Sequence, residues 1–142
     1  MRILAVDPGE KHIGVAISDE GARLARPLAT LRHKARAHDA AQIVALAEAN
    51  EAGRILVGYP LDSDGRPGAQ ARHAEAVADA IRALTALPVE LVDESFSSLE
   101  AQAALRTAGK SRRAQQDQIH AAAAAAILQG YLDEHTGQTP PE

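Results

Sequence analysis

The spacing of apolar residues changes part-way along this chain of 142 residues, and the change restricts the possible folds more than any other feature. In three early segments the apolar residues form a short run or alternate with a period of two, which is typical of β-strands. These segments are residues 3–6, 13–17 and 22–31. The first is continuously apolar and ends at Asp-Pro-Gly, as expected of a buried central strand. Pro27 has no N–H to donate to a neighbouring strand, which predicts an edge position for the third segment.

From residue 39 onwards, apolar residues recur every three or four positions, the spacing of an amphipathic helix, and short apolar runs separate the helical stretches. Helices are expected at residues 39–53, 69–87, 97–109 and 111–133, with strands at residues 54–58 and 89–92. Asp39 is expected to cap the first helix, and Gly53 to end it in a left-handed conformation. Because parallel neighbours need crossover connections, this order predicts an α/β fold, a five-stranded mixed sheet with helices on both faces.

Length and composition indicate one globular domain. The chain is 46% hydrophobic and 24% charged, ordinary values for a packed domain, and it is too short for a two-lobed kinase. We expect a single domain over residues 1–135 and a disordered tail over residues 136–142. The sequence has neither a signal-peptide core nor a membrane span, which favours a cytoplasmic protein without a membrane partner. A net charge of −4 argues against a general nucleic-acid coat and leaves room for a local basic patch.

Three acidic residues occupy positions that simple solvation does not explain well: Asp7, Glu94 and Asp117. Asp7 and Glu94 each follow a predicted buried strand, at the sheet edge where α/β proteins bind ligands. Asp117 precedes an alanine-rich stretch and shares its helical face, where burying an unpaired carboxylate costs roughly several kcal/mol. Taken singly, a turn accounts for Asp7 and a solvated loop for Glu94. Together, the three residues are candidates to converge at one edge of the sheet.

Converging carboxylates require a counter-charge, because mutual repulsion disfavours three ionised groups in one place unless a cation lies among them. The chain contains no cysteine, so a metal must bind through oxygen or imidazole, and Mg²⁺ or Mn²⁺ suits a carboxylate site. Two such ions about 3.5–4 Å apart activate water and stabilise a leaving oxygen in phosphodiester hydrolysis. The three residues therefore favour a metal-dependent nuclease in which Asp7, Glu94 and Asp117 hold the metal.

Basic residues gather in two groups, at residues 32–36 and 110–113. A charge run is usually a solvated face, and this interpretation is favoured for the first group. The second group lies just before Asp117 at a helix N-terminus, where free N–H groups and the helix dipole favour phosphate. Its candidate substrate contacts are Lys110, Arg112 and Arg113, and Lys11 is a further candidate because it is close to Asp7 in sequence. With aromatic residues at 2%, base stacking is not the main binding mode.

The six histidines show no tight spacing of metal ligands, so packing or solvation is the favoured explanation for most of them. His120 is the exception because it follows Asp117 by three residues and can share its helical face. At that position it could act as a proton shuttle or support a metal ligand. For His120, too, the sequence favours simple packing.

Four segments resemble the YqgF family, also called RuvX-type Holliday-junction resolvases and pre-16S rRNA nucleases. These segments are residues 3–16, 57–65, 93–94 and 117–133, and the likeness covers nearly the whole chain in order. The resemblance implies an RNase H-like fold, a divalent metal cofactor, and catalytic roles for Asp7, Glu94 and Asp117. One position departs from the family pattern Asp-Glu-Arg-x-Ser-Thr, because Ser95 stands where the family has arginine.

The resemblance implies a hydrolase that cuts RNA in 5′-end processing of pre-16S rRNA, with a pre-ribosomal particle as partner. One alternative is a resolvase for four-way DNA junctions, which needs two active sites at a fixed separation and hence a dimer. The sequence shows no clear dimer stripe, so monomer and homodimer both remain open. Another alternative is a non-catalytic nucleic-acid-binding or ribosome-associated module. Ser95 supports this last hypothesis, since the missing guanidinium would be a natural phosphate contact.

Overall fold

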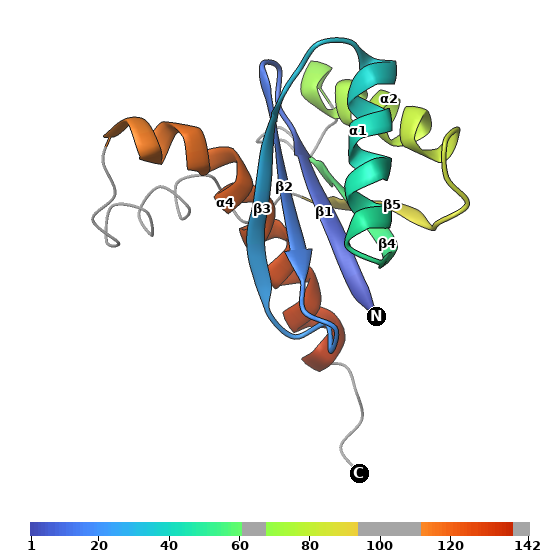
Figure 1. Ribbon diagram of the computed structural model, residues 1–142, viewed down its shortest axis with the longest axis vertical. Helices are drawn as coiled ribbons and strands as arrows, with labels where there is room; N and C mark the ends of the chain where they lie inside the picture. Colours follow the sequence, from blue (N-terminus) through green and yellow to red (C-terminus); the bar gives the residue numbers. More distant parts are fainter. Residues whose placement is uncertain (61–67, 94–111, 138–142) are drawn as a thin grey trace.

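The computed structural model describes residues 1–60, 68–93 and 112–137 of the chain, with side chains in the last range described for residues 119–135. Figure 1 shows five strands that form one sheet and helices packed against it. In chain order the described elements are β1 (Arg2–Pro8), β2 (His12–Ser18), β3 (Ala25–Arg32), α1 (Arg36–Ala49), β4 (Ala52–Tyr59), α2 (Ala69–Arg82), β5 (Val89–Asp93) and α4 (Arg112–Gly137). The helix expected at residues 97–109 lies outside the described residues.

The strand order is β3-β2-β1-β4-β5, which confirms the expected five-stranded sheet with the first strand at its centre. β1 pairs antiparallel with β2 and parallel with β4, and β5 continues the parallel half, so the sheet is mixed. β3 is an edge strand, as Pro27 predicted, and the register between β2 and β3 shifts at this proline. A bulge there accommodates a residue that cannot donate a ladder hydrogen bond.

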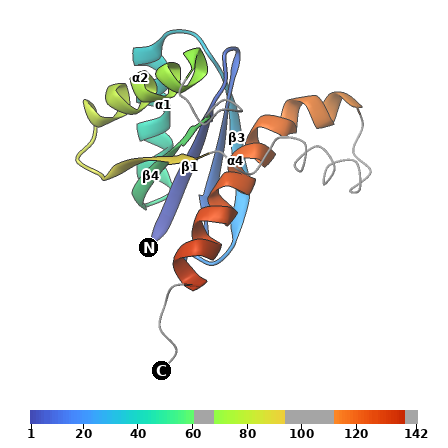
Figure 2. The same ribbon diagram turned by 180° about the vertical axis from the view of Figure 1, so that it is seen from behind.

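The helices cover both faces of the sheet, as expected. Figures 1 and 2 show α1 and α2 together on one face and α4 on the other. Against α1 and α2 the sheet presents a large aliphatic core whose bulkiest fully buried members are Leu4, Ile13, Ile17, Ile43, Ile55 and Ile81. The α4 face is smaller and richer in alanine, with Ala5, Ala16 and Ala124 among its buried residues. No helix among the described residues is long and apolar enough to cross a membrane.

The ends of α1 differ from the sequence prediction. The helix begins at Arg36 rather than at Asp39, and its N-cap residue makes no side-chain capping bond. The Asp39 carboxylate is turned instead towards the preceding segment, where it accepts a hydrogen bond from the backbone N–H of Lys34 at 3.1 Å. The left-handed residue after the helix is Glu51, with φ of 56°, rather than Gly53. Gly53 lies inside β4, where an added Cβ would come within 2.5 Å of the Met1 side chain.

The other two described helices also end away from their expected positions. The apolar spacing of residues 77, 81 and 84 is the basis for the helix expected at residues 69–87. α2 ends at Arg82, with Val77 and Ile81 buried, whereas Leu84 lies beyond the helix and is 50% exposed. α4 continues to Gly137 instead of ending near Asp133. Helix ends depend on the contacts available around them, and apolar spacing alone locates them poorly.

Candidate active site

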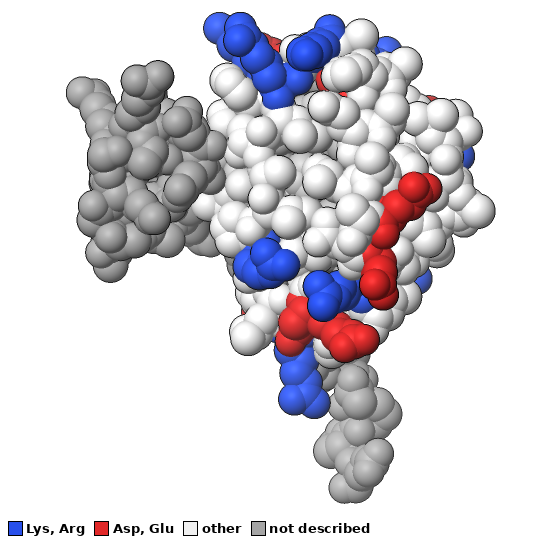
Figure 3. Space-filling view, in the orientation of Figure 1, with Lys and Arg blue, Asp and Glu red and all other residues white. Residues whose placement is uncertain are grey.

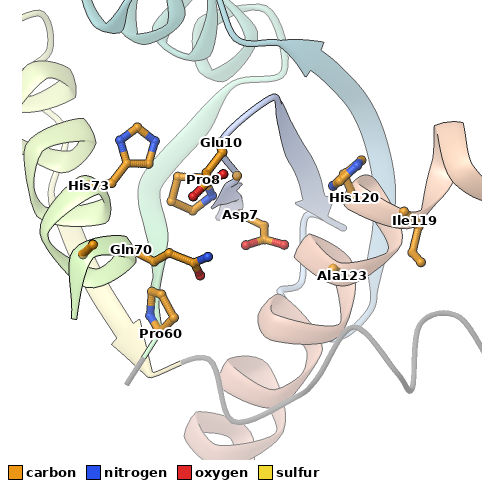
Figure 4. Close-up of a pocket in the computed structure, with 11 residues that line it drawn as sticks. Asp7, Pro8, Glu10, Pro60, Gln70, His73, Ile119, His120 and Ala123 are labelled. Atoms are coloured by element: carbon orange, nitrogen blue, oxygen red, sulfur yellow. The ribbon is translucent and has the colours of Figure 1, made fainter. Parts of the chain in front are cut away.

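A pocket of about 320 Å³ lies at the carboxyl end of β1, between α2 and α4 (Figure 4). The turn after β1 forms its floor, and the two helices form opposite walls. Its lining residues are Asp7, Pro8, Gly9, Glu10, Pro60, Ala69, Gln70, His73, Ile119, His120 and Ala123. The carboxyl edge of parallel strands is where open α/β sheets bind ligands, so the location is the one expected for a functional site.

Strand periodicity decides which wall Asp7 faces. Ile3 and Ala5 pack in the core under α4, and side chains alternate along a strand, so Asp7 lies on the same face of the sheet. Its side chain is partly exposed, which leaves the carboxylate accessible to a ligand. The turn begins after Asp7 rather than at it, because β1 extends to Pro8 and the Gly9 N–H donates to the His12 carbonyl at 3.0 Å. The turn and the pocket therefore share Gly9.

Gly14 sets the distance between α4 and the sheet. It is the β2 partner of Asp7 in the antiparallel register. A Cβ added to Gly14 would lie 1.7 Å from the backbone oxygen of His120, so only glycine permits this approach of the helix. The close approach fixes His120 on the wall beside Asp7.

His120 is the α4 residue that the structure places in the pocket with Asp7. Its ring stacks on that of His12, with centroids 4.9 Å apart and planes inclined by 22°. Burial lowers the pKa of His120 below the usual 6.5, the nearby His12 lowers it further, and the negative charge of Asp7 raises it. At neutral pH the imidazole is therefore uncharged, with a lone pair that can accept a proton or bind a cation. Simple packing, favoured from the sequence, does not fully describe this residue.

The opposite wall comes from α2 and was not anticipated from the sequence. Figure 4 shows Gln70 with its amide end directed towards Asp7, and His73 beside it on the same helix. The two residues are three positions apart, which brings them to one helical face. That spacing was the one available signal, and it has no meaning until the helix is known to border a pocket.

The other predicted site residues are less fully placed. Glu94 and Lys110 lie outside the described residues, as does Ser95. Asp117, Arg112 and Arg113 belong to α4, but their side chains are outside the described set. The backbone puts Asp117 one helical turn before His120. Among the described residues, no three side chains of His, Asp or Glu gather in a metal-binding arrangement.

Lys11 lies in the turn that follows the pocket floor, and its side chain is exposed. Its carbonyl accepts a hydrogen bond from the backbone N–H of His33 at 2.8 Å, which brings the first basic group next to it. We call the exposed side chains of Lys11, Arg32, Lys34 and Arg36 the basic rim. In Figure 3 one group of Lys and Arg side chains lies at the upper edge of the molecule, where Figure 1 has the β1–β2 turn and the β3–α1 connection, and others lie lower beside acidic side chains. The run at residues 32–36 thus lies next to the turn that follows the pocket floor, which its sequence position did not indicate.

The family described as "RuvX: Holliday junction resolvase" matches residues 1–134. The chain belongs to the RuvX family. This confirms the resemblance seen in the four sequence segments. Three of those segments contribute to the pocket: the first supplies residues 7–10, the second Pro60, and the last residues 119, 120 and 123. Three of the four segments therefore meet at one place in the fold.

Relatives of this RuvX chain carry a more specific name. A protein of Anaeromyxobacter sp. (strain Fw109-5) named "Putative pre-16S rRNA nuclease" is 46% identical over 133 residues, covering 94% of this chain and 97% of its own length. A protein of Chloroflexus aurantiacus (strain ATCC 29366 / DSM 635 / J-10-fl) with the same name is 42% identical, covering 92% of this chain and 86% of its own length.

Solved structures confirm the RNase H-like fold expected of a RuvX protein. T. thermophilus RuvC in complex with a Holliday junction substrate matches with a TM-score of 0.62 and 17% identity, over 100% of this chain and 99% of RuvC. The fowlpox virus resolvase, in complex with Holliday junction DNA, matches with a TM-score of 0.58 and 12% identity, over 95% and 99% of the two chains. At these identities the likeness establishes the fold.

Proposed function

We propose that this RuvX protein is a metal-dependent nuclease that hydrolyses phosphodiester bonds in the 5′-end processing of pre-16S rRNA. The observation that carries the proposal is the accessible Asp7 carboxylate in the pocket at the end of β1, with the neutral His120 beside it. The name shared by relatives at 42–46% identity supports RNA as the substrate. This role implies a cytoplasmic protein that meets a pre-ribosomal particle.

The carboxylate of Asp7 at the pocket fits Mg²⁺ or Mn²⁺. It offers the oxygen ligands that these ions prefer, and the chain has no thiol to favour a softer metal. We propose Asp7, Glu94 and Asp117 as the metal ligands and catalytic acids. When bound, the ion supplies Lewis-acid stabilisation of the phosphate and lowers the pKa of a bound water.

The remaining site residues can accept a proton from the attacking water or contact phosphates of the substrate backbone. His120, whose lowered pKa favours the uncharged imidazole at neutral pH, can accept a proton at its unprotonated ring nitrogen as water attacks. The basic rim, which includes Lys11, can hold phosphates that flank the pocket. Lys110, Arg112 and Arg113 stay candidates for the same task from the α4 side. Cations around the pocket can thus compensate for the arginine that Ser95 replaces.

A second candidate function is resolution of four-way DNA junctions. It is favoured by the family description and by the fold shared with two resolvases solved with Holliday junction DNA. Symmetrical cutting of a junction requires two copies of the pocket in one complex. Sedimentation of the protein with and without a junction tests this requirement, and a monomer in both cases rejects the resolvase.

The nuclease is tested with end-labelled pre-16S RNA, single-stranded DNA and a four-way junction in Mg²⁺ or Mn²⁺. We expect RNA to be cut fastest, and Asp7→Asn to slow cleavage at least about 100-fold because it removes the charge that holds the ion. Asp79→Asn, an exposed aspartate at the far end of α2, is the matched control and should cut normally. Binding of Mn²⁺ to the folded state should raise the melting temperature of the unmodified protein more than that of Asp7→Asn.

Equal cleavage by Asp7→Asn and the unmodified protein would overturn the assignment of the site. Preferential, symmetrical cutting of the junction would favour the resolvase. Salt-dependent RNA binding without cleavage in either metal would support the non-catalytic module that the sequence left open.

A further inference from the structure

The α2 wall of the pocket holds a histidine that the proposed nuclease chemistry does not use. His73 lines the pocket, and its Nε2 atom is buried without a hydrogen-bond partner among the described residues. Buried polar atoms in folded proteins are nearly always paired, so an unpaired one beside a cavity points to a missing partner. A ligand in the pocket is the simplest source of that partner.

A series of contacts through His33 to Asp39 holds the His73 ring in place. His73 packs edge-to-face against His33, with ring centroids 6.0 Å apart and planes inclined by 81°. Nδ1 of His33 contacts the carboxylate of Asp39, which is only 1% exposed. The other oxygen of Asp39 accepts the Lys34 N–H at 3.1 Å. A buried carboxylate therefore orients His33, and His33 restricts the ring that borders the pocket.

The α2 wall offers hydrogen-bond donors, and the acidic side chain of Glu10 lines the pocket from the β1–β2 turn. α2 begins at Ala69 after the N-cap Gly68, and its first turn contains no acidic residue. Ala69 and Gln70 line the pocket, so the first turn, with its free N–H groups and the positive end of the helix dipole, lies at the same wall. Gln70 adds an amide that can donate. The α2 wall thus favours an anion, whereas the Asp7 side of the pocket favours a cation.

We propose that His73, together with Gln70 and the first turn of α2, binds a phosphate group of the nucleic-acid substrate next to the phosphodiester presented to Asp7. The identity of the ligand as nucleic acid rests on the proposed function, whereas binding of a phosphate oxygen by Nε2–H does not. In this arrangement His73 positions the backbone and takes no part in proton transfer. Asp39 and His33 are positioning residues that act through His73.

The first test separates substrate binding from chemistry. His73→Phe keeps an aromatic ring against His33 and removes the donor, so we expect KM for RNA to rise about tenfold with kcat nearly unchanged. His73→Gln, which retains a donor, should recover most of the affinity. His38→Phe, at an exposed histidine of α1, is the matched control and should leave KM unchanged. An unchanged KM in His73→Phe, or a loss in kcat alone, would overturn the proposal.

The second test needs no cleavage, so it remains decisive if the nuclease proposal fails. Inorganic phosphate is titrated into the unmodified protein labelled with ¹⁵N, and the imidazole resonances are followed by NMR, with His73 assigned by its loss in His73→Gln. We expect the Nε2 resonance of His73 to shift with phosphate and not with an equal concentration of chloride. Equal responses to both salts, or no response, would reject a phosphate site at His73.

Discussion

The two faces of the sheet pack against their helices with side chains of different size. Against α1 and α2, the strands present large aliphatic side chains such as Leu4 and Ile55. Ile43 of α1 and Ile81 of α2 pack in the same cluster. Against α4, alanine and glycine lie on the strands beside Ile3 and Leu56. The helix packs Ala124 together with larger residues such as Leu128 against them. The first face buries more apolar volume, whereas the second brings a helix backbone close to the strands.

The two faces differ in what their contacts do: those of one face mainly stabilise the fold, and those of the other also position the site. Large aliphatic contacts stabilise by burial, and small shifts in helix position change them little. Small residues contribute less burial, but they fix the distance between helix and sheet, and this distance places His120 beside Asp7. We therefore expect truncations in the aliphatic core between the sheet and α1/α2 to alter stability mainly, and changes on the α4 face to alter stability and activity together.

Ile43→Ala should have the largest effect on stability. Ile43 is fully buried on the α1/α2 face, and truncating such a residue costs about 2–5 kcal/mol of unfolding free energy. Because Ile43 is not among the residues that line the pocket, kcat/KM of the folded fraction should stay unchanged. Urea denaturation measures the first quantity and cleavage kinetics the second. A parallel fall in kcat/KM would break the proposed division between the two faces.

Gly14→Ala should cost somewhat less stability, about 1–3 kcal/mol, through overpacking. The added Cβ meets the backbone of His120, so α4 must move away from the sheet, and cleavage should fall as well. Gly21→Ala is the control, because an added Cβ there meets nothing within 4 Å. If Gly14→Ala lost stability and kept full activity, the α4 face would not set the geometry of the site.

The smallest predicted effect is at Tyr131, on the α4 face, and it concerns the dependence of stability on pH. Burial raises the pKa of Tyr131 above 10.0, the charge of Glu90 raises it further, and Arg54 lowers it. From pH 10 up to the folded-state pKa, the folded protein holds a proton that the unfolded chain has lost, so stability falls as pH rises through this window. Tyr131→Phe should make the alkaline fall in melting temperature shallower. An unchanged pH profile would mean that Tyr131 titrates normally.

Comparison with the structure shows which features of the fold local sequence patterns can predict. The spacing of apolar residues predicted which segments form strands and which residues share a face of the sheet. Asp7 stood out because it ends a buried strand. Pro27 predicted an edge strand from its missing N–H, which the sheet order confirms. The start of α1 was wrong because the Asp39 carboxylate bonds backwards to Lys34, and spacing alone cannot distinguish that bond from a helix cap.

The sequence by itself determined the strands, the mixed sheet and the family, because these follow from side-chain periodicity and turn chemistry within short segments. Only the tertiary structure decided which residues meet at the pocket. Asp7 faces His120 because Gly14 permits the close approach of α4, and His73 lies opposite because α2 begins at the same edge of the sheet. Such meetings depend on packing between segments far apart in the chain, where a difference of one methyl group changes the separation of a helix from a sheet.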